Sequence, residues 1–101
     1  EFDVIVFGTG FETETLLGVS DIKGRGGKSL RETWKPVPEA YLGITVSGFP
    51  NLYVLYGPNT NLGHNSILNM IEAQVDYTVR ALQAAKAHGV AALDVKPAVM
   101  A

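Results

Sequence analysis

The sequence predicts an α/β fold with a few strands and one long helix near the C-terminus. Two short segments, Val4–Phe7 and Leu52–Tyr56, are apolar on both faces, which is typical of strands buried in a parallel sheet. Residues 65–88 repeat apolar side chains at helical spacing, and Gly89 follows where such a helix would end. The second strand, a turn at Gly57 and this helix form a unit that the rest of the chain is expected to support.

The composition is that of one small globular domain of 101 residues and excludes several classes of protein. Apolar residues make up 47% of the chain, too many for a disordered segment. The net charge of −2 gives no general attraction to nucleic acid or anionic lipid. No apolar run approaches the roughly 20 residues of a membrane span. The lack of cysteine excludes disulfides and thiolate chemistry and favours a reducing compartment, so we expect a cytoplasmic protein with no nucleic-acid or membrane partner.

The first predicted strand ends at Phe7 and is followed by Gly8-Thr9-Gly10. Glycines on both sides of a threonine allow a tight turn and a close approach by another segment or a ligand. The chain also begins at Glu1, without an initiator methionine or a signal peptide, and enters this strand almost at once. We therefore expect the 101 residues to be a single fragment of a longer protein.

The middle of the chain, residues 11–40, is less regular, although residues 12–19 are compatible with a short helix. Gly27-Lys28-Ser29 lies in a basic, glycine-rich stretch that lacks the upstream glycine of a phosphate-binding P-loop, so a surface turn is expected there. Leu30, Trp34 and Tyr41 are spaced apolar anchors that we expect to pin this segment to the surface of the domain.

Two further strands are predicted around the central turn and at the end of the chain. Residues 42–48 alternate well enough for a strand, and Gly48-Phe49-Pro50-Asn51 predicts a turn that leads into Leu52–Tyr56. These two strands are expected to be neighbours, with the second one central because it has no polar face. Residues 90–99 predict an edge strand, broken by Asp94 and Pro97.

The long helix, from about Asn65 to His88, carries an apolar stripe that we expect to be buried as core. Asn65 or Ser66 suits the N-cap, and Gly89 suits a left-handed C-cap. The first N–H groups of a helix lack partners within it and favour a carbonyl or phosphate of a ligand. Capping by side chains and water is an equally good interpretation. The stripe consists of Ile67, Ile71, Val75, Val79 and Leu82.

No residue makes a convincing catalytic or metal centre on its own. His64 and His88 are far apart and have no clear carboxylate pattern, so no metal site is predicted. Glu72 lies inside the helix and is better explained by an exposed or structural role than as a general base. Ser66 lacks the glycine-flanked elbow of a serine hydrolase.

Three groups of residues resemble one family of flavoproteins. Asp3-Val-Ile-Val-Phe-Gly-Thr-Gly10-Phe11 resembles the Asp-x-x-x-x-Ala-Thr-Gly strand of two-dinucleotide-binding flavoproteins. The run Gly-Phe-Pro-Asn-Leu-Tyr, Gly57-Pro58 and the helix with Met70-Ile-Glu72-Ala-Gln74 resemble the C-terminal FAD-domain segment of Baeyer–Villiger and related flavin-containing monooxygenases. Also in the expected order are Gly26-Gly27, Leu30, Trp34 and Tyr41-Leu42-Gly43.

This resemblance implies a partial FAD-binding fold in which residues 1–101 form the C-terminal part of an FAD domain. It implies a parent that uses FAD and NADPH and inserts oxygen next to a ketone carbonyl, with N- or S-oxygenation as the alternative. It places the Thr-Gly turn near bound FAD and the start of the long helix at the isoalloxazine ring, with Ile67 acting through its backbone. The implied cofactor-binding residues are Thr9, Gly10, Gly57, Pro58, Asn65, Ser66 and Ile67.

The chain also departs from the family pattern. Gly8 stands where the family usually has alanine. The Gly-x-Gly-x-x-Gly that holds the FAD pyrophosphate, the NADP-binding fold and the catalytic arginine are not in this sequence, so no catalytic residue is assigned. We expect the isolated chain to be inactive without the missing remainder of the flavoprotein. A third hypothesis is a non-catalytic module that self-associates through uncovered strand edges and the helix stripe.

Overall fold

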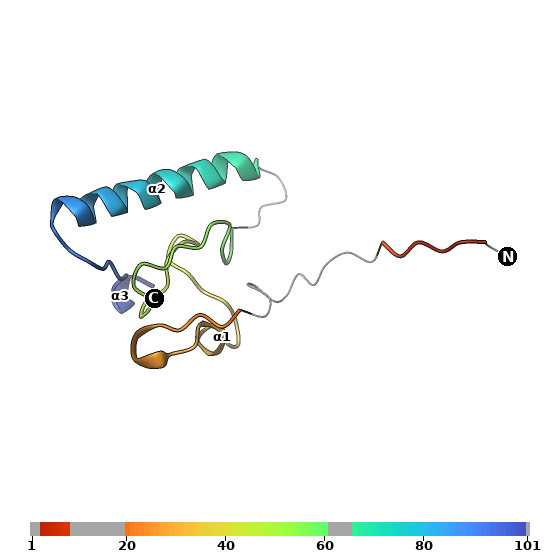
Figure 1. Cartoon of the computed structure of the whole chain (residues 1–101), viewed down its shortest axis with the longest axis horizontal. Helices are drawn as coiled ribbons and strands as arrows, with labels where there is room; N and C mark the ends of the chain where they lie inside the picture. The colour runs from red at the N-terminus through yellow and green to blue at the C-terminus, as the bar shows by residue number, and fades with distance from the viewer. Residues whose placement is uncertain (1–2, 9–19, 61–65, 101) are drawn as a thin grey trace.

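The computed structural model describes residues 3–8, 20–60 and 66–100 of the chain. Their elements, in order, are a 3₁₀ turn η1 at Arg25–Gly27 and three helices, α1 at Leu30–Thr33, α2 at Ile67–Ala87 and α3 at Pro97–Met100. Helix α2 lies along one side of the body that residues 20–60 form, and α1 lies toward the opposite side (Figure 1). Residues 3–8 lie apart from this body (Figure 1).

The strands that the sequence predicts are not formed in the described part of the chain. The side chains of Val4–Phe7 are 70–87% exposed, so this segment buries neither face. Residues 90–96 also form no strand, and Pro97 begins α3 instead. Proline is favoured at the first position of a helix because it has no N–H to satisfy and its φ is already near the helical value. The β-type pairing present in the described residues consists of two isolated bridges, Lys23 with Ser29 and Tyr41 with Thr45.

The two central segments that were expected to be neighbouring strands do lie beside each other. The Val54 N–H donates to the Ile44 carbonyl at 2.7 Å. A strand requires a repeated ladder of such bonds between extended segments. The backbone instead turns at Leu42, Asn51 and Tyr56, which have positive φ values of 54°, 60° and 57°. The prediction of adjacency is therefore confirmed by one hydrogen bond, whereas the prediction of strands is wrong for these residues.

The hydrophobic core forms between α1 and the segment around residues 46–54. Leu30 and Trp34, which the sequence predicts as anchors, are 1% and 7% exposed, and Tyr41 is half-buried. The indole Nε1 of Trp34 donates to the Glu39 carbonyl at 2.9 Å, which satisfies its polar atom in the core. The buried members of the core are Leu30, Trp34, Val46, Phe49 and Val54.

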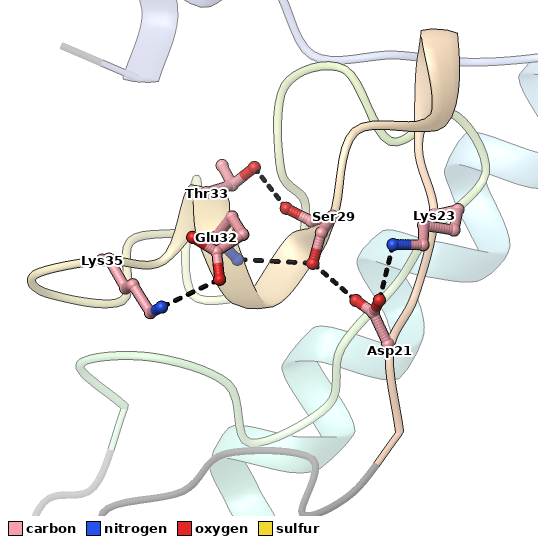
Figure 2. Close-up of polar contacts among 6 residues, drawn as sticks. All are labelled: Asp21, Lys23, Ser29, Glu32, Thr33 and Lys35. Carbon is pink, nitrogen blue, oxygen red and sulfur yellow. Dashed lines mark hydrogen bonds and ion pairs between the residues drawn. The ribbon is translucent and has the colours of Figure 1, made fainter.

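Ser29 is the N-cap of α1. The Gly27-Lys28-Ser29 stretch that leads into the helix is a surface turn, as predicted. The Ser29 hydroxyl accepts a hydrogen bond from the Glu32 N–H at 3.4 Å and donates to Asp21 Oδ1 at 2.5 Å (Figure 2). Lys23 Nζ lies 2.6 Å from the other oxygen of Asp21. Hydrogen bonds from Lys23 and Ser29 hold the pKa of the Asp21 carboxyl below its ordinary value.

Asn51 joins the central turn to the C-terminal segment. Its N–H donates to the Leu93 carbonyl at 2.9 Å, and its side-chain amide donates to the Ala91 carbonyl at 3.0 Å. Its Oδ1 accepts from the Leu93 N–H at 2.9 Å. Asparagine tolerates its φ of 60° better than most residues do. Close by, Arg25 Nε donates to Asp94 Oδ2 at 3.0 Å, which ties η1 to the same segment.

Helix α2 has almost the predicted bounds, but a different face is packed. Ser66 is the N-cap, His88 is the C-cap, and Gly89 follows with the expected positive φ of 65°. The residue of α2 that is fully buried is Gln74, which shares one face with the half-buried Tyr77, Ala81 and Ala85.

The apolar stripe of α2 lies on the neighbouring face and is largely exposed, contrary to the expectation of core. The periodicity identified an apolar face correctly, but burial depends on what packs against it, and the described chain covers this face only in part. The exposed fractions are 43% for Ile67, 41% for Val75, 44% for Val79 and 51% for Leu82, while Ile71 is half-buried. No helix in the described residues is long and apolar enough to cross a membrane.

We expect Asn51→Ala to lower the free energy of unfolding by about 2 kcal/mol, because it removes two side-chain hydrogen bonds and places alanine at positive φ. Asn51→Gly is the matched control, since glycine accepts this backbone conformation and should lose only about 1 kcal/mol, through the missing side-chain bonds. Urea unfolding of the chain measures both. Equal stability of Asn51→Ala and the wild type would contradict this role.

Candidate functional site

The structure describes four of the seven predicted cofactor-binding residues. Gly57 and Pro58 lie in the turn that ends the central segment, and Ser66 and Ile67 lie at the start of α2. Thr9, Gly10 and Asn65 lie outside the described residues, as does His64.

The turn at Gly57 packs directly on the backbone at Gly43. A Cβ atom on Gly57 would overlap the Gly43 carbonyl oxygen and would lie 3.2 Å from the Val54 side chain. A Cβ atom on Gly43, which has a φ of 70°, would overlap the methyl group of Thr60 and lie 3.1 Å from the Pro58 carbonyl oxygen. Neither position has room for a side chain, so glycine lets the two backbones touch.

Thr60 closes this turn and holds its shape. The Thr60 N–H and hydroxyl both donate to the Gly57 carbonyl, at 3.3 and 2.8 Å, and Thr60 is 8% exposed. Pro58 has no N–H and cannot donate to a ligand, so it contributes a fixed φ to the turn. The turn is therefore a rigid, buried support for the segments around it.

The start of α2 has backbone donors without a partner among the described residues. Among the described residues, none accepts a hydrogen bond from the N–H groups of Ile67, Leu68 or Asn69. The first intrahelical bond to the cap residue runs from the Met70 N–H to the Ser66 carbonyl at 3.3 Å. The first turn contains no acidic side chain, so nothing within it offsets the positive end of the helix dipole. This helix end can bind a carbonyl or an anionic group.

A concave space of about 360 Å³ lies beside these elements. Thr60 comes from the turn, Met70 and Gln74 come from α2, and the remaining wall is mainly apolar. A mostly apolar hollow with a few polar groups near it is the usual form of a binding site for an organic ligand. The lining residues are Leu42, Ile44, Thr60, Met70, Ala73, Gln74 and Tyr77.

Gln74 links α2 to the residue that precedes the turn, a contact that the sequence analysis did not predict. The Tyr56 N–H donates to Gln74 Oε1 at 2.7 Å, and Gln74 is 5% exposed. The sequence contains one sign of this contact: Gln74 lies on the same helix face as Tyr77, Ala81 and Ala85. A polar side chain on a packed face needs a hydrogen-bond partner. In the sequence, Gln74 was part of the family motif without any role of its own.

Tyr77 lies on the packed face of α2 near two other tyrosines. Partial burial raises the pKa of the Tyr77 hydroxyl above its ordinary value, and the negative charge that Tyr41 and Tyr53 can carry raises it further. The hydroxyl of Tyr77, a residue that lines the hollow, therefore stays neutral at ordinary pH. It can take part in packing or hydrogen bonding there but supplies no charge.

Other parts of the described chain have fewer polar groups placed to bind a ligand. A second hollow of about 220 Å³ includes Thr45, Phe49 and Tyr53, and its one charged residue, Asp94, is already bonded to Arg25. Thr45 Oγ1 is buried there without a hydrogen-bond partner among the described residues. Glu72 is exposed on α2, in agreement with the structural or surface role expected for it. Within residues 3–8, 20–60 and 66–100, no three acidic, histidine or cysteine side chains are grouped to hold a metal ion.

Comparisons with known proteins match nearly the whole chain to one segment of larger enzymes. The chain is 47% identical over 96 residues to a Baeyer–Villiger monooxygenase of Pseudomonas aeruginosa, covering 95% of this chain and 18% of that protein. It is 51% identical over 89 residues to the FAD-binding monooxygenase ktnD of Aspergillus niger, covering 85% of this chain and 15% of that protein. No model of a known protein family matches the chain.

The fold is also similar to part of a solved structure. An oxidized steroid monooxygenase bound to NADP superimposes with a TM-score of 0.72 and 35% sequence identity, covering 79% of this chain and 15% of that one. The chain therefore spans less than a fifth of the length of each of these relatives. The similarity predicted from the sequence is confirmed, and it concerns one segment of those proteins.

We expect Gly57→Ala to lower the free energy of unfolding by about 1–3 kcal/mol, because the new methyl group would overlap the Gly43 carbonyl. Gly8→Ala is the control, since a Cβ atom at Gly8 meets nothing within 4 Å and should change stability by less than about 0.5 kcal/mol. Urea unfolding measures both variants. A Gly57→Ala protein as stable as the Gly8→Ala protein would show that the two backbones do not need this close approach.

Proposed function

We propose, from the premise that the chain is homologous to one segment of the Baeyer–Villiger monooxygenases, that it forms the C-terminal part of the FAD domain of a longer enzyme. The observation that carries the proposal is near-half identity to a Baeyer–Villiger monooxygenase across almost the whole chain. We propose that this enzyme uses FAD and NADPH and inserts one oxygen atom next to the carbonyl of a ketone.

The described residues fit a flavin ring at the start of α2. The N–H groups of Ile67, Leu68 and Asn69 are donors at the positive end of a 21-residue helix, and the first turn has no acidic side chain to repel an electron-rich group. An apolar hollow lined by Met70 and Ala73 of the same helix can receive a flat, partly apolar ring. These features support a site for the carbonyl-bearing edge of an isoalloxazine.

In this proposal, the chain binds and orients the cofactor, and it performs no proton transfer of its own. The bound flavin supplies the redox chemistry and the activation of O₂. The N–H groups at Ile67 and its neighbours hold the ring edge and favour negative charge on it. The Gly57–Pro58 turn supports this helix end through its rigid packing on Gly43. Thr9, Gly10, Asn65 and Ser66 are proposed to complete the FAD site.

Titration of FAD fluorescence tests the cofactor assignment. We expect the isolated 101-residue chain to bind FAD weakly or not at all, because the pyrophosphate-binding glycine motif is not in this sequence. We expect the protein encoded by the full gene to be yellow and to bind FAD stoichiometrically. A full-length protein that binds no FAD would contradict the proposal.

Products of the full-length enzyme with NADPH and O₂ test the reaction. We expect a ketone to give the ester or lactone. Oxidation of amines or sulfides with no reaction on ketones would instead indicate a heteroatom-oxygenating enzyme.

A second proposal concerns the isolated chain, which exposes apolar surface that a complete domain would cover. Val6 and Phe7 are 87% and 83% exposed, and Leu68 on the side of α2 is 72% exposed. Apolar surface of this kind promotes association. We therefore expect the isolated chain to self-associate in sedimentation experiments and to bind the dye ANS. A monomer that binds no dye would contradict this proposal.

A further inference from the structure

Gln74 is a polar side chain in a position that would otherwise suit an apolar one. It is 5% exposed and lies on the face of α2 that packs against the body, with Tyr77 and Ala81 on the same face. Burying an amide without a hydrogen bond costs more free energy than burying an apolar side chain of similar size. A residue kept at this position for packing alone could be leucine or methionine.

The hydrogen bond that Gln74 makes explains why an acceptor is useful there. Its Oε1 accepts from the Tyr56 N–H at 2.7 Å, and because the partner is a backbone donor, the oxygen rather than the nitrogen of the amide must face it. Tyr56 has a φ of 57°, a conformation that is unfavourable for a bulky residue and needs support from its surroundings.

This bond connects the two elements of the candidate site. Tyr56 directly precedes Gly57, whose backbone rests on Gly43 and whose carbonyl is held by Thr60. Gln74 lies two turns into α2, beyond the first-turn donors at Ile67. The bond therefore ties the first half of α2 to the residue that precedes a rigid turn.

We propose that Gln74 is a positioning residue that sets where the α2 donors point, and that it acts through its hydrogen bond with the Tyr56 N–H. The proposal rests on the flavin site proposed above. A purely structural role for Gln74 would change stability alone. A positioning role must also change how FAD is held and how readily it is reduced.

The test compares Gln74→Met and Gln74→Glu in the full-length protein. Methionine has a similar size but offers no comparable acceptor, whereas glutamate keeps an acceptor oxygen whether or not it is ionised. We expect Gln74→Met to weaken FAD binding by about 10- to 100-fold, the effect of losing one buried hydrogen bond. Its flavin midpoint potential should become more negative, because the helix donors no longer favour negative charge on the ring. Gln74→Glu, measured at a pH where its buried carboxyl is protonated and carries no charge, should bind FAD within about threefold of wild type.

Two control variants separate positioning from stability. Gln83→Met makes the same substitution on an exposed part of α2, and Leu30→Ala weakens the core at α1, on the side of the body opposite α2 (Figure 1). Both should keep the wild-type FAD affinity and midpoint potential, although Leu30→Ala should lower the melting temperature. If Gln74→Met does not fold, Gln74→Asn, which is one methylene too short to reach Tyr56, takes its place in the same measurements.

The outcomes distinguish this proposal from the proposed function. A Gln74→Met protein with a lower melting temperature but a wild-type FAD dissociation constant and midpoint potential would contradict the positioning role alone. A Gln74→Glu protein that behaves like Gln74→Met would contradict it as well. A wild-type full-length protein that binds no FAD would overturn the proposed function and this role together.

Discussion

The close approach of two backbone segments at Gly43 and Gly57 is the constraint on which the rest of the site depends. In the described residues no sheet holds these segments together, so their geometry comes from this contact and from a few hydrogen bonds. The Val54 N–H bonds to Ile44, and Thr60 closes the turn onto Gly57. Once the turn is fixed in this way, the Gln74 bond to Tyr56 can hold α2 against it. The close contact between Gly43 and Gly57 therefore also restrains α2, through the hydrogen bond between Tyr56 and Gln74.

Helix α2 has one face that packs against the body and a neighbouring apolar face that is largely exposed. One face of α2, around Gln74 and Tyr77, contacts the body, while the neighbouring face with Val75, Val79 and Leu82 remains 41–51% exposed. A 21-residue helix with two such faces is typical of an element that lies between two layers of a larger domain.

Local patterns predicted the helix well and predicted its surroundings poorly. The bounds of α2 follow from Ser66 and Gly89, which act within one turn of the helix ends. Which face would be buried depended on distant segments, so the apolar stripe was wrongly expected to be core. The strands failed for the same reason, since extended segments become strands only when a partner lies alongside.

The candidate site was predicted through family resemblance more than through physical pattern. The turn at Gly57 and the helix start were identified as a unit. The structure shows a hollow lined by Thr60, at the end of that turn, and by Met70 and Gln74 of α2, and a hydrogen bond from the Tyr56 N–H to Gln74. Gln74 and Asn51 were missed because their partners lie 18 and about 40 positions away, beyond the reach of any periodicity. The cofactor-binding roles of all seven residues stay predictions, and three of them, Thr9, Gly10 and Asn65, also lie outside the described part of the chain.

The most direct test of the account is amide hydrogen exchange at the start of α2 in the full-length protein, measured with and without FAD. If Ile67, Leu68 and Asn69 donate to the flavin, FAD should slow the exchange of these amides strongly, while the exposed turn at Arg25–Gly27 should exchange at the same rate in both states. Unchanged exchange at all three positions in protein that has bound FAD would contradict the claim that this helix end holds the cofactor.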